Sequence, residues 1–270
     1  MRRVLVFGAA VAIAAAFVAC GGASGGGVEV RVVEGAQTPT AGVHQTPGNG
    51  MPIPTPSPAA AMETASPQPT AAAPREEKYL PCGDILVPVD KERALAPDCA
   101  PSDLVALPEE VVVSGPQYLR AEAAEALLRM LRDASEAGHD IRVTSAYRSY
   151  EEQTWTFEYW VQQLGEAEAR RTSAEPGHSE HQLGTTVDLS TAEIGYALTP
   201  AFGDTPAGRW LAENAWRYGF VMSYPDGSEP VTGYAYEPWH WRYVGVGVAA
   251  EIRELGVLSV QYLRARWESR

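Results

Sequence analysis

The chain has 270 residues and a formal net charge of −13 at pH 7, with five histidines and three cysteines. This acidic balance argues against a nucleic-acid partner, because neutralising phosphates requires clustered Lys and Arg side chains. The part of the chain with a globular composition is about 190 residues long, which is the size of one domain.

Residues 1–20 have the layout of a secretory signal. Two arginines precede an apolar run that ends at Cys20, and the run is short for a membrane-spanning helix. The tetrapeptide at 17–20 resembles a bacterial lipobox, although Phe17 stands where Leu is usual. We therefore expect a lipoprotein of the cell envelope, anchored outside the cytoplasm through a lipid on Cys20. Stable anchoring takes more than one acyl chain, and the diacylglyceride of bacterial lipoproteins would meet that need. The alternative is a plain cleaved signal and a secreted protein.

Residues 21–77 predict a linker. Nine prolines lie between Pro39 and Pro74, mixed with Thr, Ala, Ser and Gln, and Glu63 is the only charged residue there. Such a segment buries too little apolar surface to offset its ordering entropy, and its prolines stiffen it. The globular domain is therefore expected at 78–270, where all seven tryptophans lie.

Cys82 and Cys99 are the two cysteines of this domain, in a segment with few signals of regular structure. An exported protein occupies an oxidising compartment, so we expect a disulfide between them. Closing this loop would stabilise the fold by about 3 kcal/mol in the chain-entropy model. Metal binding by the two cysteines is the weaker interpretation, because no histidine lies near them in sequence.

The first half of the domain begins with a predicted helix over 118–134, where apolar residues recur at helical spacing, and Gly138 follows it as a C-cap. Alternating β-branched residues predict a strand at 141–147. Ser149 and Glu152 have the spacing of a capping box for a helix that runs to about Leu164.

The second half alternates strands and helices. Strands are expected at 185–189, 220–224 and 236–244, and a helix at 206–218 with Thr205 as its cap and Pro206 at its first position. Two further helices are expected, one from about Val248 and one over 260–267. The order predicts an α+β fold, with a small antiparallel sheet and packed helices.

His181 and Asp188 lie seven residues apart, and Glu237 and His240 lie three apart. A catalytic zinc site takes three protein ligands and leaves a fourth position open. His181, Asp188 and His240 would supply a mixed nitrogen and oxygen shell for one Zn²⁺ per chain. Glu237 would then be the general base that takes a proton from the attacking water.

The spacing of both pairs requires a bend in the chain. Side chains an odd number of residues apart on a straight strand point to opposite faces. Gly184 offers a bend within the first pair, and Pro238 fixes the backbone within the second. Residue types and spacing alone leave alternatives to a metal site open. Isolated histidines commonly lie on the surface, Trp239 also fits a hydrophobic core, and Arg148 also fits a structural ion pair.

A resemblance to a known family narrows these alternatives. The segment 179–188, SEHQLGTTVD, matches the S-x-H-x-x-G-x-A-x-D motif of the VanY-type D-alanyl-D-alanine carboxypeptidases, and EPWH at 237–240 matches their E-x-x-H motif. The segment 145–150 with Gln153 matches their upstream S-x-Y-R-S block, and Tyr218-Gly219-Phe220 also fits. These blocks lie in the family's order within about residues 115–255. One departure is Thr186, which stands where the family usually has Ala.

The resemblance implies a zinc peptidase that cleaves the terminal peptide bond of the peptidoglycan stem, with the zinc site in a cleft on the sheet. Arg148 would join the zinc in stabilising the oxyanion, and Arg148, Ser179 and Gln153 would position the substrate's free carboxylate. Tyr147 and Trp239 would line the cleft. His181, rather than His178, matches the ligand position, and His178 is expected on a loop near the cleft.

The substrate expected from the resemblance is a stem peptide that ends in a D-residue, and we expect the protein to act as a monomer. D,D-carboxypeptidase activity is the leading hypothesis. L,D-carboxypeptidases share the same ligand motifs, so the motifs do not separate the two. A non-catalytic cell-wall-binding lipoprotein is the alternative from another class, and such a protein would be expected to lose a ligand or the base, whereas this chain keeps all of them.

Overall fold

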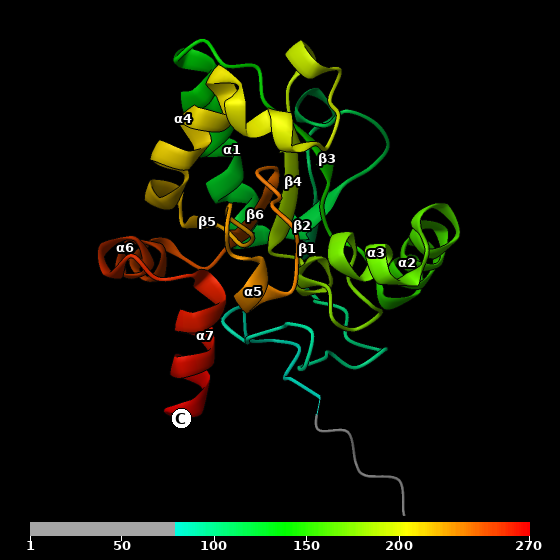
Figure 1. The fold of residues 1–270 in the computed structure, drawn as a ribbon. Helices are drawn as coiled ribbons and strands as arrows, with labels where there is room; N and C mark the ends of the chain where they lie inside the picture. Colours follow the sequence, from blue (N-terminus) through cyan, green and yellow to red (C-terminus); the bar gives the residue numbers. More distant parts are fainter. Residues whose placement is uncertain (1–78) are drawn as a thin grey trace, which may run out of the picture. The chain divides into compact units, whose positions relative to one another are not determined.

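The computed structural model describes residues 79–270, and the predictions for the signal, Cys20 and the linker lie outside these residues. Within the described range no helix has both the length and the apolar character that crossing a membrane requires. The fold is α+β, as the sequence predicts. A central antiparallel sheet is joined by a two-stranded sheet and surrounded by helices (Figure 1).

The central sheet has the strand order β3-β4-β6-β5. Its strands are β3 (Arg142–Ser145), β4 (Thr186–Ser190), β5 (Phe220–Met222) and β6 (His240–Tyr243), and every neighbouring pair is antiparallel. The smaller sheet pairs β1 (Leu104–Ala106) with β2 (Tyr118–Arg120).

The two faces of the central sheet differ in chemistry. Val187 pairs with Trp241 across β4 and β6, and both belong to the main hydrophobic core. The next pair is Asp188 with His240, whose side chains point to the opposite face because strand side chains alternate. The residues predicted to bind metal therefore lie on the face of the sheet away from the main core.

Helices α1 (Ala121–Glu136) and α4 (Pro206–Asn214) pack against the apolar face, and their buried residues join Val187 and Trp241 in the core. The other helices are α2 (Tyr150–Leu164), α3 (Glu166–Thr172), α5 (Glu229–Thr232), α6 (Val246–Leu255) and α7 (Ser259–Glu268). The α2–α3 pair lies at one side of the sheet, and α6 and α7 lie at the other (Figure 1). Short 3-10 helices cover Glu109–Val111, Glu180–Leu183, Ala192–Ile194, Pro200–Asp204 and Ala215–Tyr218.

Several predicted elements have different limits in the structure, and the causes are visible for two of them. The helix expected from residue 118 starts at Ala121, because residues 118–120 pair with β1 as strand β2. The strand expected over 236–244 is shortened to β6, because residues before it form a turn in which the His240 N–H donates to the Glu237 carbonyl at 3.1 Å. The first difference comes from a contact between two segments, and the second comes from a local turn.

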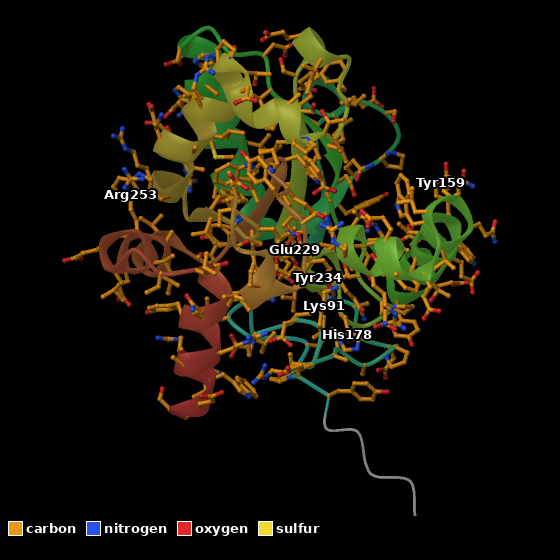
Figure 2. The ribbon with its side chains drawn as sticks, in the orientation of Figure 1. Lys91, Tyr159, His178, Glu229, Tyr234 and Arg253 are labelled. Atoms are coloured by element: carbon orange, nitrogen blue, oxygen red, sulfur yellow. A yellow bond between two sulfur atoms is a disulfide. The ribbon has the colours of Figure 1, made fainter. Side chains whose placement is uncertain are left out.

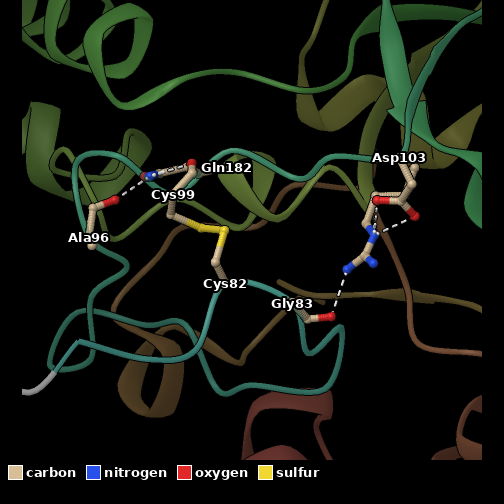
Figure 3. Close-up of a disulfide and its surroundings, with 7 residues drawn as sticks. Cys82, Gly83, Ala96, Cys99, Asp103 and Gln182 are labelled. Atoms are coloured by element: carbon tan, nitrogen blue, oxygen red, sulfur yellow. Dashed lines mark hydrogen bonds and ion pairs between the residues drawn. A yellow bond between two sulfur atoms is a disulfide. The ribbon is translucent and has the colours of Figure 1, made fainter.

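Cys82 and Cys99 are joined by a disulfide with a Cα–Cα distance of 5.4 Å. We refer to residues 80–99, which contain it, as the disulfide segment. The Gln182 side-chain amide donates to the Ala96 carbonyl at 2.9 Å and to the Cys99 carbonyl at 3.2 Å (Figure 3). The disulfide segment is thus attached to the 3-10 helix that carries His181.

Candidate metal centre and active site

His181, Asp188 and His240 lie together in the structure, and one potential ligand atom from each falls within 4.8 Å of the others. All three residues are buried, each with 4% of its surface exposed. They come from three places in the fold: the 3-10 helix before β4, the middle of β4 and the first residue of β6. The structure therefore brings together the three residues that the motifs predicted as ligands.

Gly184 makes the turn between His181 and β4. Its φ is +68°, a left-handed conformation that glycine adopts without strain, and it caps the 3-10 helix Glu180–Leu183. A Cβ at this position would lie 2.8 Å from the side chain of Leu104. The bend that the spacing required is present, and both the backbone angle and the neighbouring side chain favour glycine there.

The imidazole of His181 is oriented by the backbone. Its Nδ1 lies 2.6 Å from the Ala146 carbonyl oxygen, which only accepts hydrogen bonds, so Nδ1 carries the proton. The unprotonated Nε2 then faces Asp188, with 3.3 Å between Nε2 and Oδ2. This arrangement presents Nε2 as the ligand nitrogen of His181.

In His240 the nitrogen that faces the cluster is Nδ1, whereas in His181 it is Nε2. The Nδ1 of His240 lies 3.4 Å from Asp188 Oδ1 and 3.6 Å from Glu237 Oε2. Its Nε2 lies 2.9 Å from Glu180 Oε2, on the side away from Asp188. The two imidazole rings are nearly perpendicular, with centroids 5.1 Å apart.

The cluster fits a zinc ion. Asp188 Oδ1 is buried and makes no hydrogen bond, so this carboxylate oxygen lacks the partner that a buried polar atom normally has. A cation between the three residues would supply it. Two imidazole nitrogens and one carboxylate oxygen form a donor set typical of catalytic zinc.

The charges of the cluster are strongly coupled in the absence of metal. Burial opposes ionisation of Asp188, but His181 and His240 hold its pKa well below the usual range. Burial lowers the pKa of His181. Burial also acts against protonation of His240, yet the neighbouring carboxylates of Asp188 and Glu180 raise its pKa to about 10.

Glu237 is the carboxylate beside the cluster whose one ion pair among the described residues is the 3.6 Å contact with His240 Nδ1. Burial raises its pKa to about 8, and the charges of Asp188 and Glu180 act in the same direction against His240. A bound divalent cation would reverse this balance and favour the ionised form. The position and the electrostatics of Glu237 suit a group that exchanges protons near neutral pH.

Glu180 is a residue that the sequence reasoning missed. Burial alone would raise its pKa, but Arg242, His240 and Ser223 lower it to about 2. Its Oε1 lies 2.7 Å from Arg242 Nη1, and its Oε2 accepts a hydrogen bond from Ser223 Oγ at 2.6 Å. The available signal was an ionisable residue next to His181 in a stretch that is otherwise poor in charge.

Arg148 lies next to the cluster and is held by two side chains. Its Nη1 donates to Gln153 Oε1 at 2.7 Å, and its Nη2 donates to Ser145 Oγ at 2.9 Å. Nη2 is also 3.9 Å from Asp188 Oδ2. The guanidinium is thereby directed toward the metal cluster.

A cavity of about 370 Å³ opens onto the cluster. Of the residues predicted to act on substrate, Arg148, Ser179, Glu237 and Trp239 line it. Its remaining walls come from α2, the end of α3 and two loops, and include Thr156, Trp160, Leu164, Ala174, Leu198, Pro200, Tyr224, Tyr234 and Tyr236.

Gln153 and Tyr147 are not among the residues that line this cavity. Gln153 is fully buried, and its side-chain amide donates to the Ala174 carbonyl at 2.6 Å while its oxygen accepts from Arg148. The contact of these two residues with substrate stays a prediction. In the structure Gln153 holds Arg148.

His178 also lies outside this cavity. Its Nδ1 is 2.6 Å from the Asp90 carbonyl, and Figure 2 shows it close to Lys91, away from the sheet. Lys91 contacts Tyr234, a residue of the cavity wall, and its Nζ lies 3.6 Å from the centroid of the Tyr234 ring. His178 therefore takes part in attaching the disulfide segment.

Comparison with known proteins places this site in a family. Residues 116–246 match the family model described as VanY, D-alanyl-D-alanine carboxypeptidase. The chain is 40% identical over 185 residues to the protein YodJ of Bacillus subtilis (strain 168), covering 66% of this chain and 67% of YodJ. The chain belongs to the VanY D-alanyl-D-alanine carboxypeptidase family.

Solved structures of VanY-family proteins extend this finding. The LdcB LD-carboxypeptidase shares 40% identity with a TM-score of 0.62, over 67% of this chain and 86% of that one. The D,D-pentapeptidase VanY from a VanB-type resistance cassette, a mutant in complex with Zn(II), shares 28% identity with a TM-score of 0.56, over 66% of this chain and 98% of that one. Zinc is thus the metal of a VanY-family relative, and this chain has a His-Asp-His cluster for it.

The VanY family match covers all of the metal cluster, Glu237 and Arg148, and ends just after β6. The disulfide segment lies outside residues 116–246. It nevertheless contacts the 3-10 helix that carries His181.

Proposed function

We propose that this protein is a zinc carboxypeptidase that removes the terminal D-residue from peptidoglycan stem peptides. The observation that carries the proposal is the buried cluster of His181, Asp188 and His240, with Glu237 and Arg148 beside it at one cavity. These three residues would hold Zn²⁺, which when bound polarises a carbonyl and lowers the pKa of water toward about 7.

Glu237 is the general base of the proposed reaction. Its carboxylate accepts a proton from the attacking water and later passes it to the leaving amine. The cavity wall buries it, with 7% of its surface exposed, so few bulk waters compete for that proton. Loss of this group should stop the chemistry without removing a metal ligand.

Arg148 and Ser179 are the groups proposed to bind the substrate. Both line the cavity, and the guanidinium presents a fork of N–H donors that suits a carboxylate or a developing oxyanion. Gln153 and Ser145 fix the direction of that fork. Trp239 and the apolar cavity walls would contact the rest of the peptide.

D,D-carboxypeptidase activity is the specificity that the VanY family description favours. The 40% identity to LdcB, whose structure is described as that of an LD-carboxypeptidase, favours L,D activity as a second candidate. The two differ in the configuration of the residue that precedes the cleaved bond, so the same metal cluster and base serve either reaction.

The deciding experiment incubates the zinc-loaded protein with pentapeptide and tetrapeptide stems, with and without a chelator, and follows products by mass spectrometry. Loss of D-Ala from the pentapeptide supports the D,D reaction, and loss from the tetrapeptide alone supports the L,D reaction. If neither stem is cleaved by protein of full zinc content while cell-wall binding persists, the non-catalytic binder replaces the enzyme.

The location at the cell envelope is also part of the proposal. It rests on the signal-like residues 1–20 and on Cys20, and the Cys82–Cys99 disulfide supports it because such bonds persist in oxidising compartments. Labelled palmitate should be incorporated into the expressed protein and lost in Cys20→Ser. Equal labelling of both proteins would contradict lipidation at this residue.

A further inference from the structure

We propose that Glu180 is a positioning residue, which directs His240 toward the metal and is itself held by Arg242 and the disulfide segment. The inference rests on the proposed zinc site and adds residues to it. Glu180 is buried, with 4% of its surface exposed, and both of its carboxylate oxygens have partners on the side of the sheet where His240 lies.

The first step is the tautomer of His240. An ionised carboxylate only accepts hydrogen bonds, so the 2.9 Å contact between Glu180 Oε2 and His240 Nε2 places the proton on Nε2. Nδ1 is then the nitrogen that faces Asp188 and Glu237, and it is the one that would bind a metal. A histidine that binds metal through one nitrogen and donates the other N–H to a carboxylate is held in one orientation.

The second step is the support of Glu180. Ser223 Oγ donates to the same oxygen that contacts His240, at 2.6 Å. Arg242 Nη1 lies 2.7 Å from the other oxygen. Arg242 is two residues after His240 on β6, so both side chains lie on one face of the sheet and Glu180 accepts a hydrogen bond from each.

The third step is the support of Arg242, which is fully buried. Its Nη2 donates to the Val87 carbonyl at 2.7 Å and to the Ile85 carbonyl at 3.0 Å. Both carbonyls belong to the disulfide segment, outside the region that matches the VanY family model. A continuous series of hydrogen bonds therefore joins this segment to His240 through Arg242 and Glu180.

A buried arginine and carboxylate hold each other in place, because removing one leaves the other charge without a partner in a dry environment. The same contacts hold the Glu180 carboxylate in one position before any metal arrives. Zinc would then meet a preformed His240 nitrogen, and the ordering of that side chain would not oppose metal binding.

The test measures metal binding independently of peptide cleavage. Metal-free wild type, Glu180→Gln and Glu122→Gln are titrated with zinc against a competing chelator, and the absorption spectra of their Co(II) forms are recorded. Glu122 is the matched control, since it accepts a hydrogen bond from Tyr243 on the same strand β6 at 2.5 Å but lies in α1. Glu180→Gln should weaken zinc binding about 10- to 100-fold and shift the Co(II) bands, and Glu122→Gln should change neither.

The outcomes separate this inference from the proposed function. Wild type that binds no zinc contradicts the zinc site itself. Wild type that binds zinc, with Glu180→Gln equal to it in affinity and Co(II) spectrum, overturns the positioning role. If Glu180→Gln does not fold, Ser223→Ala decides, because it removes one hydrogen bond to Glu180 and leaves both charges. Weaker zinc binding in that variant supports the role, and unchanged binding refutes it.

Discussion

Asp188 on β4 and His240 on β6 are direct partners in the antiparallel register of the central sheet. Directly opposed residues point to the same face, so this single pairing puts a carboxylate and an imidazole side by side although they are distant in sequence. A slip of one residue would turn one of them to the apolar face, where α1 and α4 pack. The hydrophobic alternation of the two strands therefore fixes the geometry of the metal cluster.

Glu237→Gln should abolish most hydrolysis and leave zinc bound. The amide has the shape of the carboxylate but does not accept a proton, and loss of a general base costs about 10²- to 10⁴-fold in rate. Stem-peptide turnover and zinc content are measured on the same preparation. Glu193→Gln, the same change at an exposed glutamate, should retain full activity. Unchanged turnover in Glu237→Gln would show that another group takes the proton.

Zinc affinity should rise with pH. In the metal-free protein burial disfavours protonated His240, but Asp188 and Glu180 raise its pKa to about 10, so this histidine is protonated at neutral pH. Zinc requires the neutral imidazole, so binding displaces at least one proton and the affinity rises about tenfold per pH unit between about pH 6 and 8. Titration calorimetry in two buffers of different ionisation enthalpy reports the protons released. A dissociation constant that is independent of pH contradicts the prediction.

Arg148→Lys should lower kcat/KM strongly while the fold and the zinc content are retained. Lysine keeps the charge but lacks the fork that contacts Gln153 and Ser145 together, and loss of a preorganised oxyanion donor costs about 10²- to 10³-fold. Steady-state kinetics on stem peptides provide the measurement. Gln153→Ala should act in the same direction with a smaller loss, since it frees the guanidinium without removing it. Wild-type kinetics in both variants would exclude Arg148 from the reaction.

Gly184→Ala should destabilise the protein and weaken zinc binding. The positive φ costs an alanine about 1–2 kcal/mol, and its Cβ would also lie 2.8 Å from Leu104. Gly195→Ala is the matched control, because Gly195 has a φ of +64° with no atom near the added Cβ. Urea unfolding should show the larger loss for Gly184→Ala, and zinc affinity should fall in that variant alone. Equal losses would mean that packing around the bend has no effect.

Replacing both Cys82 and Cys99 with serine should lower the free energy of unfolding by about 3 kcal/mol, because the open chain gains conformational freedom when unfolded. Urea unfolding of the metal-free protein measures the loss without a contribution from metal. Wild type under a reductant should reproduce the same midpoint. Stability equal to that of the oxidised wild type would show that the hydrogen bonds of the disulfide segment suffice without the covalent link.

Local patterns in the sequence predicted much of the fold. The capping box of Ser149 and Glu152 is present with both of its hydrogen bonds, and Thr205 caps α4 as its sequence indicates. These features depend on neighbours within one helical turn. The start of α1 was predicted wrongly, because pairing of residues 118–120 with β1 involves a segment whose partner the periodicity does not reveal.

The residues of the candidate site also fall into two groups: those that the sequence predicted and those whose contacts only the folded structure revealed. The sequence, through motifs that resemble those of the VanY family, predicted the three residues that the structure brings together as a metal cluster, and it predicted Glu237 and Arg148 beside them. Only the tertiary structure revealed the contact of Glu180 with His240 and the hydrogen bond from Arg148 to Gln153. Glu180, Arg242 and the carbonyls of the disulfide segment meet only after three distant parts of the chain fold onto one face of the sheet. Hydrogen bonds between such parts have no period or spacing in the sequence, so they become visible only in the folded protein.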